Sequence, residues 1–255
     1  CDARAAAIAL CSRLKGKTLA CHGNRNARLA TVAKERKAWE KELDAWTHER
    51  DAYSLEVAKE SKYMHPRQVL RELEKAMPPR AMVSTDIGNI CSISNSYLRF
   101  NEPRSMFAAM SFGNCGYAFP TIIGAKLAAP DRPAIAYVGD GAWGISFNEV
   151  QTCVRENIPV TAIVFNNGQW GAEKKNHVDF YNRRYLGVAL DNQPHWANVA
   201  IAMGAEGLRI DRLEDVGPAL AAACEAQKRG KTTIIEIMVT KELGDPFRRD
   251  ALALP

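Results

Sequence analysis

The sequence lacks the features that mark several large classes of protein. None of its seven cysteines forms a CxxC pair or shows zinc-ligand spacing, so neither a zinc site nor a thioredoxin-like motif is expected. No apolar run approaches the roughly 18 residues that span a bilayer, and the polar, helical start lacks the pattern of a signal peptide. The odd number of cysteines, spread through predicted helices, favours reduced thiols and a cytoplasmic setting.

Nucleotide and nucleic-acid signals are also missing. The formal net charge is only +5, and no stripe of Lys and Arg interleaved with aromatic residues occurs, so nucleic-acid binding is not expected. No GxGxxG follows a predicted strand, which argues against a dinucleotide-binding Rossmann domain. Apolar residues make up 47% and charged residues 25% of the chain, as in ordinary globular proteins.

Residues 1–60 differ in pattern from the rest of the chain. Residues 1–21 are expected to begin with an Ala-rich amphipathic helix, followed by a basic stretch around Lys15–Lys17 and a short apolar run. Residues 30–52 place Trp39, Leu43 and Trp46 at helical spacing among alternating acids and bases, which is typical of a solvated surface helix. We interpret 1–60 as the end of a preceding domain plus a charged helical linker. Because the first residue is Cys, we expect the chain to be part of a longer polypeptide.

Residues 61–255 alternate regularly between predicted strands and helices. The expected strands are 81–85, 134–138, 160–165, 205–210 and 232–239, and the expected helices are 65–77, 119–129, 146–156 and 216–229. The strands are almost continuously apolar, which indicates burial on both faces. The pattern therefore predicts an α/β domain with a doubly wound, mainly parallel sheet and helices on both faces.

Two of these strands end in polar clusters. One leads into Gly139-Asp140-Gly141 and the next into Asn166-Asn167, and the 24 residues between the clusters allow one crossover. Asp140 and Asn167 should thus meet at one sheet edge and offer the hard oxygen ligands that Mg²⁺ requires. The two glycines are expected to allow positive φ and a close approach of phosphate, and the helix that follows should direct its dipole at the anion.

A lone GDG is a common turn, but the whole strand–GDG–helix–strand–NN unit resembles the signature of thiamine diphosphate enzymes of the pyruvate decarboxylase and acetolactate synthase superfamily. The resemblance implies thiamine diphosphate and Mg²⁺ as cofactors. It also implies Asp140, Asn167 and the carbonyl of Gln169 as metal ligands, with Ala142, Trp170 and Gly171 lining the site.

Two further segments resemble cofactor-binding parts of the same superfamily. Residues 111–120 are similar to the segment around the aminopyrimidine ring. That similarity implies that the Gly113 carbonyl accepts from the 4′-amino group, beside Asn114, and that Cys115 replaces the bulky residue that bends the cofactor. A buried structural thiol is the alternative for Cys115. Residues 85–90 resemble the loop at the diphosphate, which implies contacts from Gly88, Asn89 and Ile90, although they also fit an ordinary strand-to-helix turn.

One branch of the superfamily fits best. The segments 112–126 (FGNCGYAFPTIIGAK), 171–176 (GAEKKN) and 244–252 (GDPFRRDAL) are similar to enzymes that convert sulfoacetaldehyde and phosphate to acetyl phosphate and sulfite. Both substrates are anions, so cationic partners are expected. The candidates are Lys174, Lys175, Arg183 and Arg184, followed by Arg248 and Arg249, unless these side chains are solvated surface charges.

The resemblance also implies a part of the active site outside this chain. In the superfamily, a glutamate from another domain activates the cofactor, and no segment here resembles that domain, so no catalytic residue is assigned in this chain. A homodimer or homotetramer with sites at subunit interfaces is expected. An acetolactate synthase, a 2-oxoacid decarboxylase or a non-catalytic subunit with the same fold are the alternatives.

Overall fold

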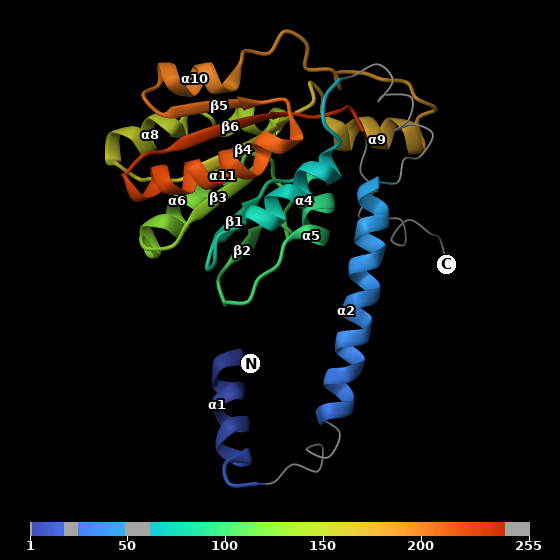
Figure 1. Cartoon of the computed structure of the whole chain (residues 1–255), viewed down its shortest axis with the longest axis vertical. Helices are drawn as coiled ribbons and strands as arrows, with labels where there is room; N and C mark the ends of the chain where they lie inside the picture. The colour runs from blue at the N-terminus through green and yellow to red at the C-terminus, as the bar shows by residue number, and fades with distance from the viewer. Residues whose placement is uncertain (1, 18–24, 49–61, 243–255) are drawn as a thin grey trace. The chain divides into compact units, whose positions relative to one another are not determined.

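The computed structural model describes residues 2–17, 25–48 and 62–242 (Figure 1). Contacts divide the chain into two compact units, Cys1–Ala45 and Trp46–Pro255. The domain boundary expected near residue 60 lies outside the described residues. Within the part of the chain that is described, no helix is both long and apolar enough to cross a bilayer.

The first unit consists of helices. In α1 (Ala3–Leu14), the Asp2 carboxylate accepts a hydrogen bond of 2.7 Å from the Ala5 amide and so caps the helix. The helix ends at Leu14, before Gly16 with its φ of 75°, and the basic stretch expected around Lys15–Lys17 follows it. The charged helix α2 (Arg25–His48) continues into the second unit, and Trp39 on it is 40% exposed, as expected for a surface helix.

The second unit contains a six-stranded sheet in which every pair of neighbours is parallel, in the order β2-β1-β3-β4-β6-β5. This confirms the doubly wound α/β prediction. The strands are β1 (Met82–Thr85), β2 (Met106–Ala108), β3 (Ala134–Gly139), β4 (Thr161–Asn166), β5 (Glu206–Ile210) and β6 (Thr233–Met238). Strand β2 was not predicted because three residues are too few to show a pattern.

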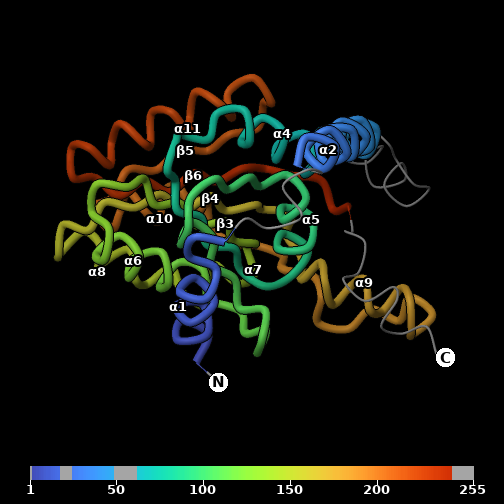
Figure 2. The backbone as a smooth tube through the Cα atoms, turned by 90° about the horizontal axis from the view of Figure 1, so that it is seen from below, coloured from blue at the N-terminus to red at the C-terminus, as the bar shows by residue number. Residues whose placement is uncertain are grey.

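Helices cover both faces of this sheet. Contacts place α4 (Pro66–Ala76), α5 (Asn89–Tyr97) and α11 (Leu213–Lys228) on one face, and α6 (Ala118–Ala128), α7 (Asp140–Ser146), α8 (Glu149–Glu156) and α10 (Trp196–Ala202) on the other. Figure 2 shows α4 and α11 on one side and α6 and α8 on the other. On β3, Ala136 and Val138 join the core beneath α6 and α7, whereas Ile135 and Tyr137 are buried on the opposite face, which explains the uninterrupted apolar strand.

One helix prediction was wrong in detail, and three other helices were missed. The single helix expected at 146–156 is two helices, because α7 already begins at Asp140 and α8 begins at Glu149. The glycine-rich GDGAWG has low helix propensity, but Trp143 is buried and packs edge-on against Phe119 at 5.0 Å between ring centroids, so tertiary packing stabilises the helix. Helices α5, α9 (Gly171–Phe180) and α10 were not predicted.

The chain order creates a switch point at the carboxyl edge of the sheet. After β1 the chain passes through α5 to β2 on one side, and after the neighbouring β3 it passes through α7 and α8 to β4 on the other. Loops that leave adjacent strands in opposite directions open a crevice between them, and ligands of such sheets bind there. Asp86 and Asp140, which follow β1 and β3, stand at this crevice.

Candidate functional site

Asp140 is the buried acid at the end of β3. Its side chain is 2% exposed, and its Oδ2 accepts hydrogen bonds from the Gly168 amide at 2.8 Å and from Gln193 Nε2 at 2.9 Å. Burial raises the pKa of Asp140 to about 6, although both hydrogen bonds act to lower it. No ion pair among the described residues includes Asp140, so a bound cation would stabilise its ionised form.

The two asparagines after β4 face different surroundings. Asn166 is buried, and its Nδ2 donates to Glu236 Oε1 at 2.8 Å. The Oδ1 of Asn167 instead accepts from the Gln169 amide at 3.2 Å, across Gly168, which has a φ of 65°. This tight turn brings Asn167 and Gln169 to the cavity that Asp140 also lines. Asp140 thus shares one corner with Asn167 and Gln169, as expected from the sequence.

A cavity of about 110 Å³ occupies the switch point; we call it the switch-point cavity. Twelve of the fourteen residues expected to bind the cofactor line it: Gly88, Asn89, Ile90, Cys115, Gly139, Asp140, Gly141, Ala142, Asn167, Gln169, Trp170 and Gly171. Gly113 and Asn114 do not line it. Residues that are up to 83 positions apart in the sequence (171 minus 88) therefore converge on one space.

The wall formed by α5 offers hydrogen-bond donors to this cavity. Gly88, with a φ of 121°, precedes the helix, whose first-turn amides have no side-chain cap. The buried Nδ2 of Asn89 has no hydrogen-bond partner among the described residues. The lining also contains the acids Asp140 and Glu173. A metal-bound diphosphate needs hydrogen-bond donors for its oxygens and acids to hold the cation, so these residues fit such a group.

The two glycines that flank Asp140 have a different role from the one expected. Gly139 has a φ of −75°, and Gly141 lies in the first turn of α7 without positive φ, so neither needs the left-handed region. Gly141 is required for space instead, because a Cβ there would lie 2.8 Å from two ring atoms of Trp170. Similarly, a Cβ on Gly171 would lie 2.7 Å from Asn89 Nδ2.

Asp86 connects the end of β1 to the loop before α6. Its fully buried carboxylate accepts from the amides of Gly116 at 3.0 Å, Ala118 at 2.9 Å and Ile87 at 2.9 Å. Burial raises the pKa of Asp86, and these amide hydrogen bonds oppose the rise. Gly116 has a φ of 79°, so the loop turns sharply at the residue that Asp86 holds. Asp86 therefore fixes the segment that carries Cys115.

Cys115 lies between the switch-point cavity and the core below α6. Burial raises the pKa of its thiol, and the charges of Asp86 and Glu173 raise it further, so the thiolate is disfavoured. A neutral, half-buried thiol is suited to a packing role rather than to nucleophilic attack. The described cysteines, which are Cys11, Cys91, Cys115, Cys153 and Cys224, form no disulfide with one another.

The candidate cations that follow the Asn167 turn make different contacts. Lys174 Nζ donates to Gln169 Oε1 at 3.2 Å and lies 5.2 Å from the centroid of the Tyr185 ring. Lys175 pairs with Asp179 at 2.5 Å instead. Arg183 and Arg184 are exposed. Arg248 and Arg249 lie outside the described residues. Of the described candidates, Lys174 thus makes the contact with the turn that contains Gln169.

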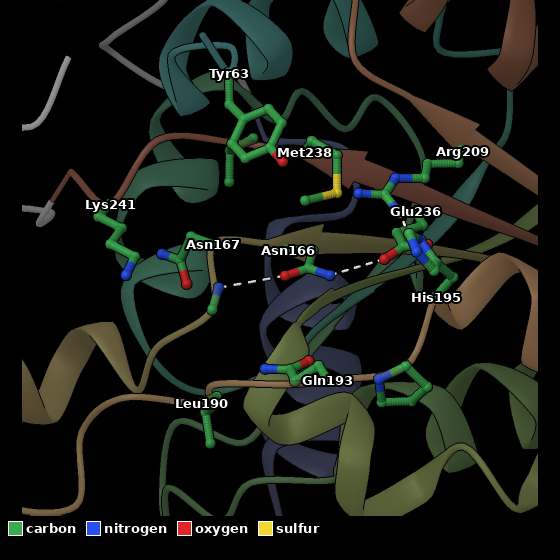
Figure 3. Close-up of a pocket in the computed structure, with 13 residues that line it drawn as sticks. Tyr63, Asn166, Asn167, Leu190, Gln193, His195, Arg209, Glu236, Met238 and Lys241 are labelled. Atoms are coloured by element: carbon green, nitrogen blue, oxygen red, sulfur yellow. Dashed lines mark hydrogen bonds between the residues drawn. The ribbon is translucent and has the colours of Figure 1, made fainter. Parts of the chain in front are cut away.

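A larger cavity of about 390 Å³ lies on the β5 and β6 side of the Asn167 turn (Figure 3). Its lining includes Glu236, which is 1% exposed and accepts from Asn166 and from the Ala197 amide at 3.2 Å. It also includes Gln193, which forms part of the wall between this cavity and Asp140. The described residues contain no group of three or more His, Cys, Asp and Glu side chains that could hold a metal, so a site rich in such ligands is not indicated.

Three polar residues of this region were missed by the sequence interpretation. Asp86 could have been found, because it follows a buried strand just as Asp140 does. Glu236 is a single acid within the apolar strand TIIEIM, which is also a recognisable signal. Gln193 gives no such signal, because it stands in a loop 26 positions after Asn167 (193 minus 167) and only the fold brings it to Asp140.

The chain is similar in sequence to several known enzymes. The chain is 64% identical to the sulfoacetaldehyde acetyltransferase of Alcaligenes xylosoxydans xylosoxydans over 100% of its own length and 44% of that protein. It is 62% identical to the enzyme of the same name from Castellaniella defragrans over 100% of this chain and 43% of that one. The acetolactate synthase large subunit of Corynebacterium glutamicum is 29% identical over 69% of this chain and 29% of its own length. The chain thus spans less than half the length of these relatives.

The solved structures that are similar share the fold. Benzoylformate decarboxylase from Polynucleobacter necessarius superposes with a TM-score of 0.62 at 24% identity, over 70% of this chain and 33% of that chain. The family model described as "Thiamine pyrophosphate enzyme, C-terminal TPP binding domain" matches residues 86–237, which begin at Asp86 and end in β6. The residues that line the switch-point cavity lie within that match, apart from Pro66, Val239 and Glu242. The chain therefore belongs to the thiamine pyrophosphate enzymes, as their C-terminal cofactor-binding domain.

Proposed function

We propose that this chain is the diphosphate- and metal-binding part of an enzyme that converts sulfoacetaldehyde and phosphate to acetyl phosphate and sulfite. The observation that carries the proposal is the sequence identity of 64% and 62% to two sulfoacetaldehyde acetyltransferases along the entire chain. Identity to the acetolactate synthases is about half as high, from 29% to 32%. The difference favours the acetyltransferase over the acetolactate synthase alternative.

The proposed role of the switch-point cavity is to hold thiamine diphosphate through Mg²⁺. Asp140 would supply the carboxylate, Asn167 its side-chain oxygen and Gln169 its main-chain carbonyl, which together form a hard-oxygen ligand set. Asn89 and the first amides of α5 would face the diphosphate. The bound cofactor supplies the carbon that reacts with the aldehyde, whereas the residues of this chain position the cofactor and compensate charge.

The segment that contains Cys115 is proposed to lie against the aminopyrimidine ring. The bonds from Gly116 and Ala118 to Asp86 fix its backbone, and Cys115 presents a neutral side chain to the cavity. In this proposal the Gly113 carbonyl accepts from the 4′-amino group. Gly113 has a φ of 77° and does not line the switch-point cavity, so the ring would extend beyond that cavity.

Lys174 is the cation that we propose for an anionic substrate, either phosphate or the sulfonate. It is half-buried, it follows the turn that contains Gln169, and its ammonium group lies beside the Gln169 side chain. The activating glutamate is proposed to come from another domain, and the active unit to be a homodimer or homotetramer with interfacial sites.

The proposed reaction has two products that distinguish it from its relatives. The full-length protein, incubated with sulfoacetaldehyde, phosphate, Mg²⁺ and thiamine diphosphate, should release sulfite and acetyl phosphate in equal amounts. Omitting phosphate should prevent the formation of acetyl phosphate. Consumption of pyruvate without sulfite release would instead identify an acetolactate synthase or a decarboxylase.

A non-catalytic subunit is the second alternative. The buried carboxylate of Asp140 argues against this alternative. Burying a carboxylate without a counter-charge costs stability, and a subunit that binds no metal would gain nothing in return. Calorimetry with thiamine diphosphate and Mg²⁺ separates the two alternatives. Binding that is lost in Asp140→Ala supports a functional site, whereas no binding by the wild-type protein would support the non-catalytic alternative.

A further inference from the structure

Gln193 lies between Asp140 and the larger cavity, in the loop that precedes α10. Its Nε2 donates to Asp140 Oδ2 at 2.9 Å, and its Oε1 accepts from Trp196 Nε1 at 2.8 Å. An indole N–H can only donate, and an ionised carboxylate can only accept. The two partners therefore determine which end of the Gln193 amide faces which side.

Trp196, which donates to Gln193, is held in place by core packing. Its ring is 7% exposed, belongs to the core and packs against Phe147 at 5.3 Å between ring centroids. The indole is thus held by packing that is independent of Asp140. A side chain bonded at one end to a fixed core residue holds its other end in a defined place, so Gln193 restricts the carboxylate of Asp140.

The restriction acts on one oxygen of the carboxylate. Gln193 and the Gly168 amide both donate to Oδ2. With Oδ2 occupied by two donors, Oδ1 is the oxygen better placed to bind a cation. Partners that orient a metal-binding carboxylate in this way increase metal affinity, typically by 10- to 100-fold.

We infer that Gln193 is a positioning residue for the divalent metal ion, which acts by orienting the carboxylate of Asp140. The inference rests on the proposed function of the switch-point cavity. It assigns a role to a residue in the loop before α10, which lies outside the GDG and NN clusters. The hydrogen bond from Trp196 is part of the same device, because it selects the orientation of the Gln193 amide.

The test measures metal binding rather than turnover alone. Mg²⁺ is titrated into the full-length protein at saturating thiamine diphosphate and followed by calorimetry, for wild type, Gln193→Met, Trp196→Phe and Gln151→Met. Gln193→Met keeps the side-chain length but removes the donor, so its Mg²⁺ dissociation constant should rise about 10- to 100-fold. Trp196→Phe keeps a ring but frees the amide, so a smaller rise is expected. Gln151 is exposed on α8, and its variant should bind as wild type does.

A second readout separates positioning from general damage. At saturating Mg²⁺, the turnover of Gln193→Met should recover towards the wild-type value, and the unfolding midpoint of its metal-free form should stay close to that of wild type. Wild-type Mg²⁺ affinity in Gln193→Met, together with lost affinity in Asp140→Ala, would overturn the inference and leave the proposed site standing. Unchanged affinity in Asp140→Ala would overturn the proposed site itself. If Gln193→Met does not fold, Trp196→Phe and Gln193→Asn decide the question by the same titration.

Discussion

The carboxylate of Asp86 accepts a hydrogen bond from the amide of Ala118, 32 residues further along the chain, at 2.9 Å. Asp86 begins the loop that follows β1, and Ala118 begins α6. The same carboxylate also binds the amide of Gly116 at 3.0 Å. These contacts join the loop after β1 to the segment proposed to contact the aminopyrimidine ring, and they make the geometry of that segment depend on a single buried side chain.

Replacing this carboxylate should loosen the segment. In Asp86→Asn, one amide N–H that the carboxylate satisfied would face an NH₂ group, and such a loss destabilises a fold by about 1–3 kcal/mol. We expect a lower urea midpoint and weaker binding of thiamine diphosphate by the full-length protein. Asp211→Asn, at an exposed position before α11, is the control. Equal midpoints for the two variants would contradict the assigned role of Asp86.

Two glycines of α7 should respond differently to the same change. An alanine Cβ at Gly141 would lie 2.8 Å from the Trp170 ring, whereas one at Gly144 meets nothing within 4 Å. Gly141→Ala should therefore displace Trp170 and destabilise the protein by about 1–3 kcal/mol. Gly144→Ala should be neutral or stabilise the helix by about 0.5–1 kcal/mol. Urea unfolding and tryptophan fluorescence measure both effects, and a neutral Gly141→Ala would refute the packing argument.

The raised pKa of Asp140 predicts a pH dependence of stability without metal. Below its ordinary value of 3.8 the side chain is protonated in both states, and between that value and about 6 the folded protein holds a proton that the unfolded chain has lost. The free energy of unfolding should therefore fall as pH rises through this window. A shift from 3.8 to about 6 corresponds to about 3 kcal/mol at neutral pH.

Asp140→Asn isolates this contribution, because the amide does not titrate. Urea unfolding of the metal- and cofactor-free proteins should show the variant gaining stability relative to wild type from pH 4 to pH 7. With added Mg²⁺ and thiamine diphosphate, the wild-type protein should be more stable than the variant at pH 7, since only the wild-type carboxylate binds the ion strongly. A constant difference between the two proteins across this pH range would disprove the prediction.

Adjacent lysines on α9 test the proposed anion contact. Lys174→Met removes the ammonium group beside Gln169, and loss of a charge-assisted hydrogen bond worth about 1.5–3 kcal/mol should raise KM for the anion by roughly 10- to 100-fold. Lys175→Met removes only the pair with Asp179, a contact of a type worth about 0.3–0.5 kcal/mol. Steady-state kinetics with varied phosphate and varied sulfoacetaldehyde would show which substrate is affected. Equal KM values for both variants would remove Lys174 from this role.

The local pattern was sufficient to predict most of the sheet. Apolar strands followed by GDG and NN gave β3 and β4, and their separation correctly placed Asp140 and Asn167 at one edge, because parallel strands joined by one crossover must end together. The short strand β2 and the polar helices α5 and α9 were missed, because their segments carry too weak a periodicity.

By itself, the sequence determined the parallel α/β fold, the acid and amide at the switch point and the family of the chain. The fold and the two side chains follow from short stretches whose composition sets their local structure, whereas the family follows from the resemblance of the GDG and NN segments to known enzymes. Only the tertiary structure decided which distant groups meet: Asp86 with Ala118, Gln193 with Asp140, and Lys174 rather than Lys175 with Gln169. Such contacts depend on how loops from different strands pack together, and no local pattern of residues specifies that packing.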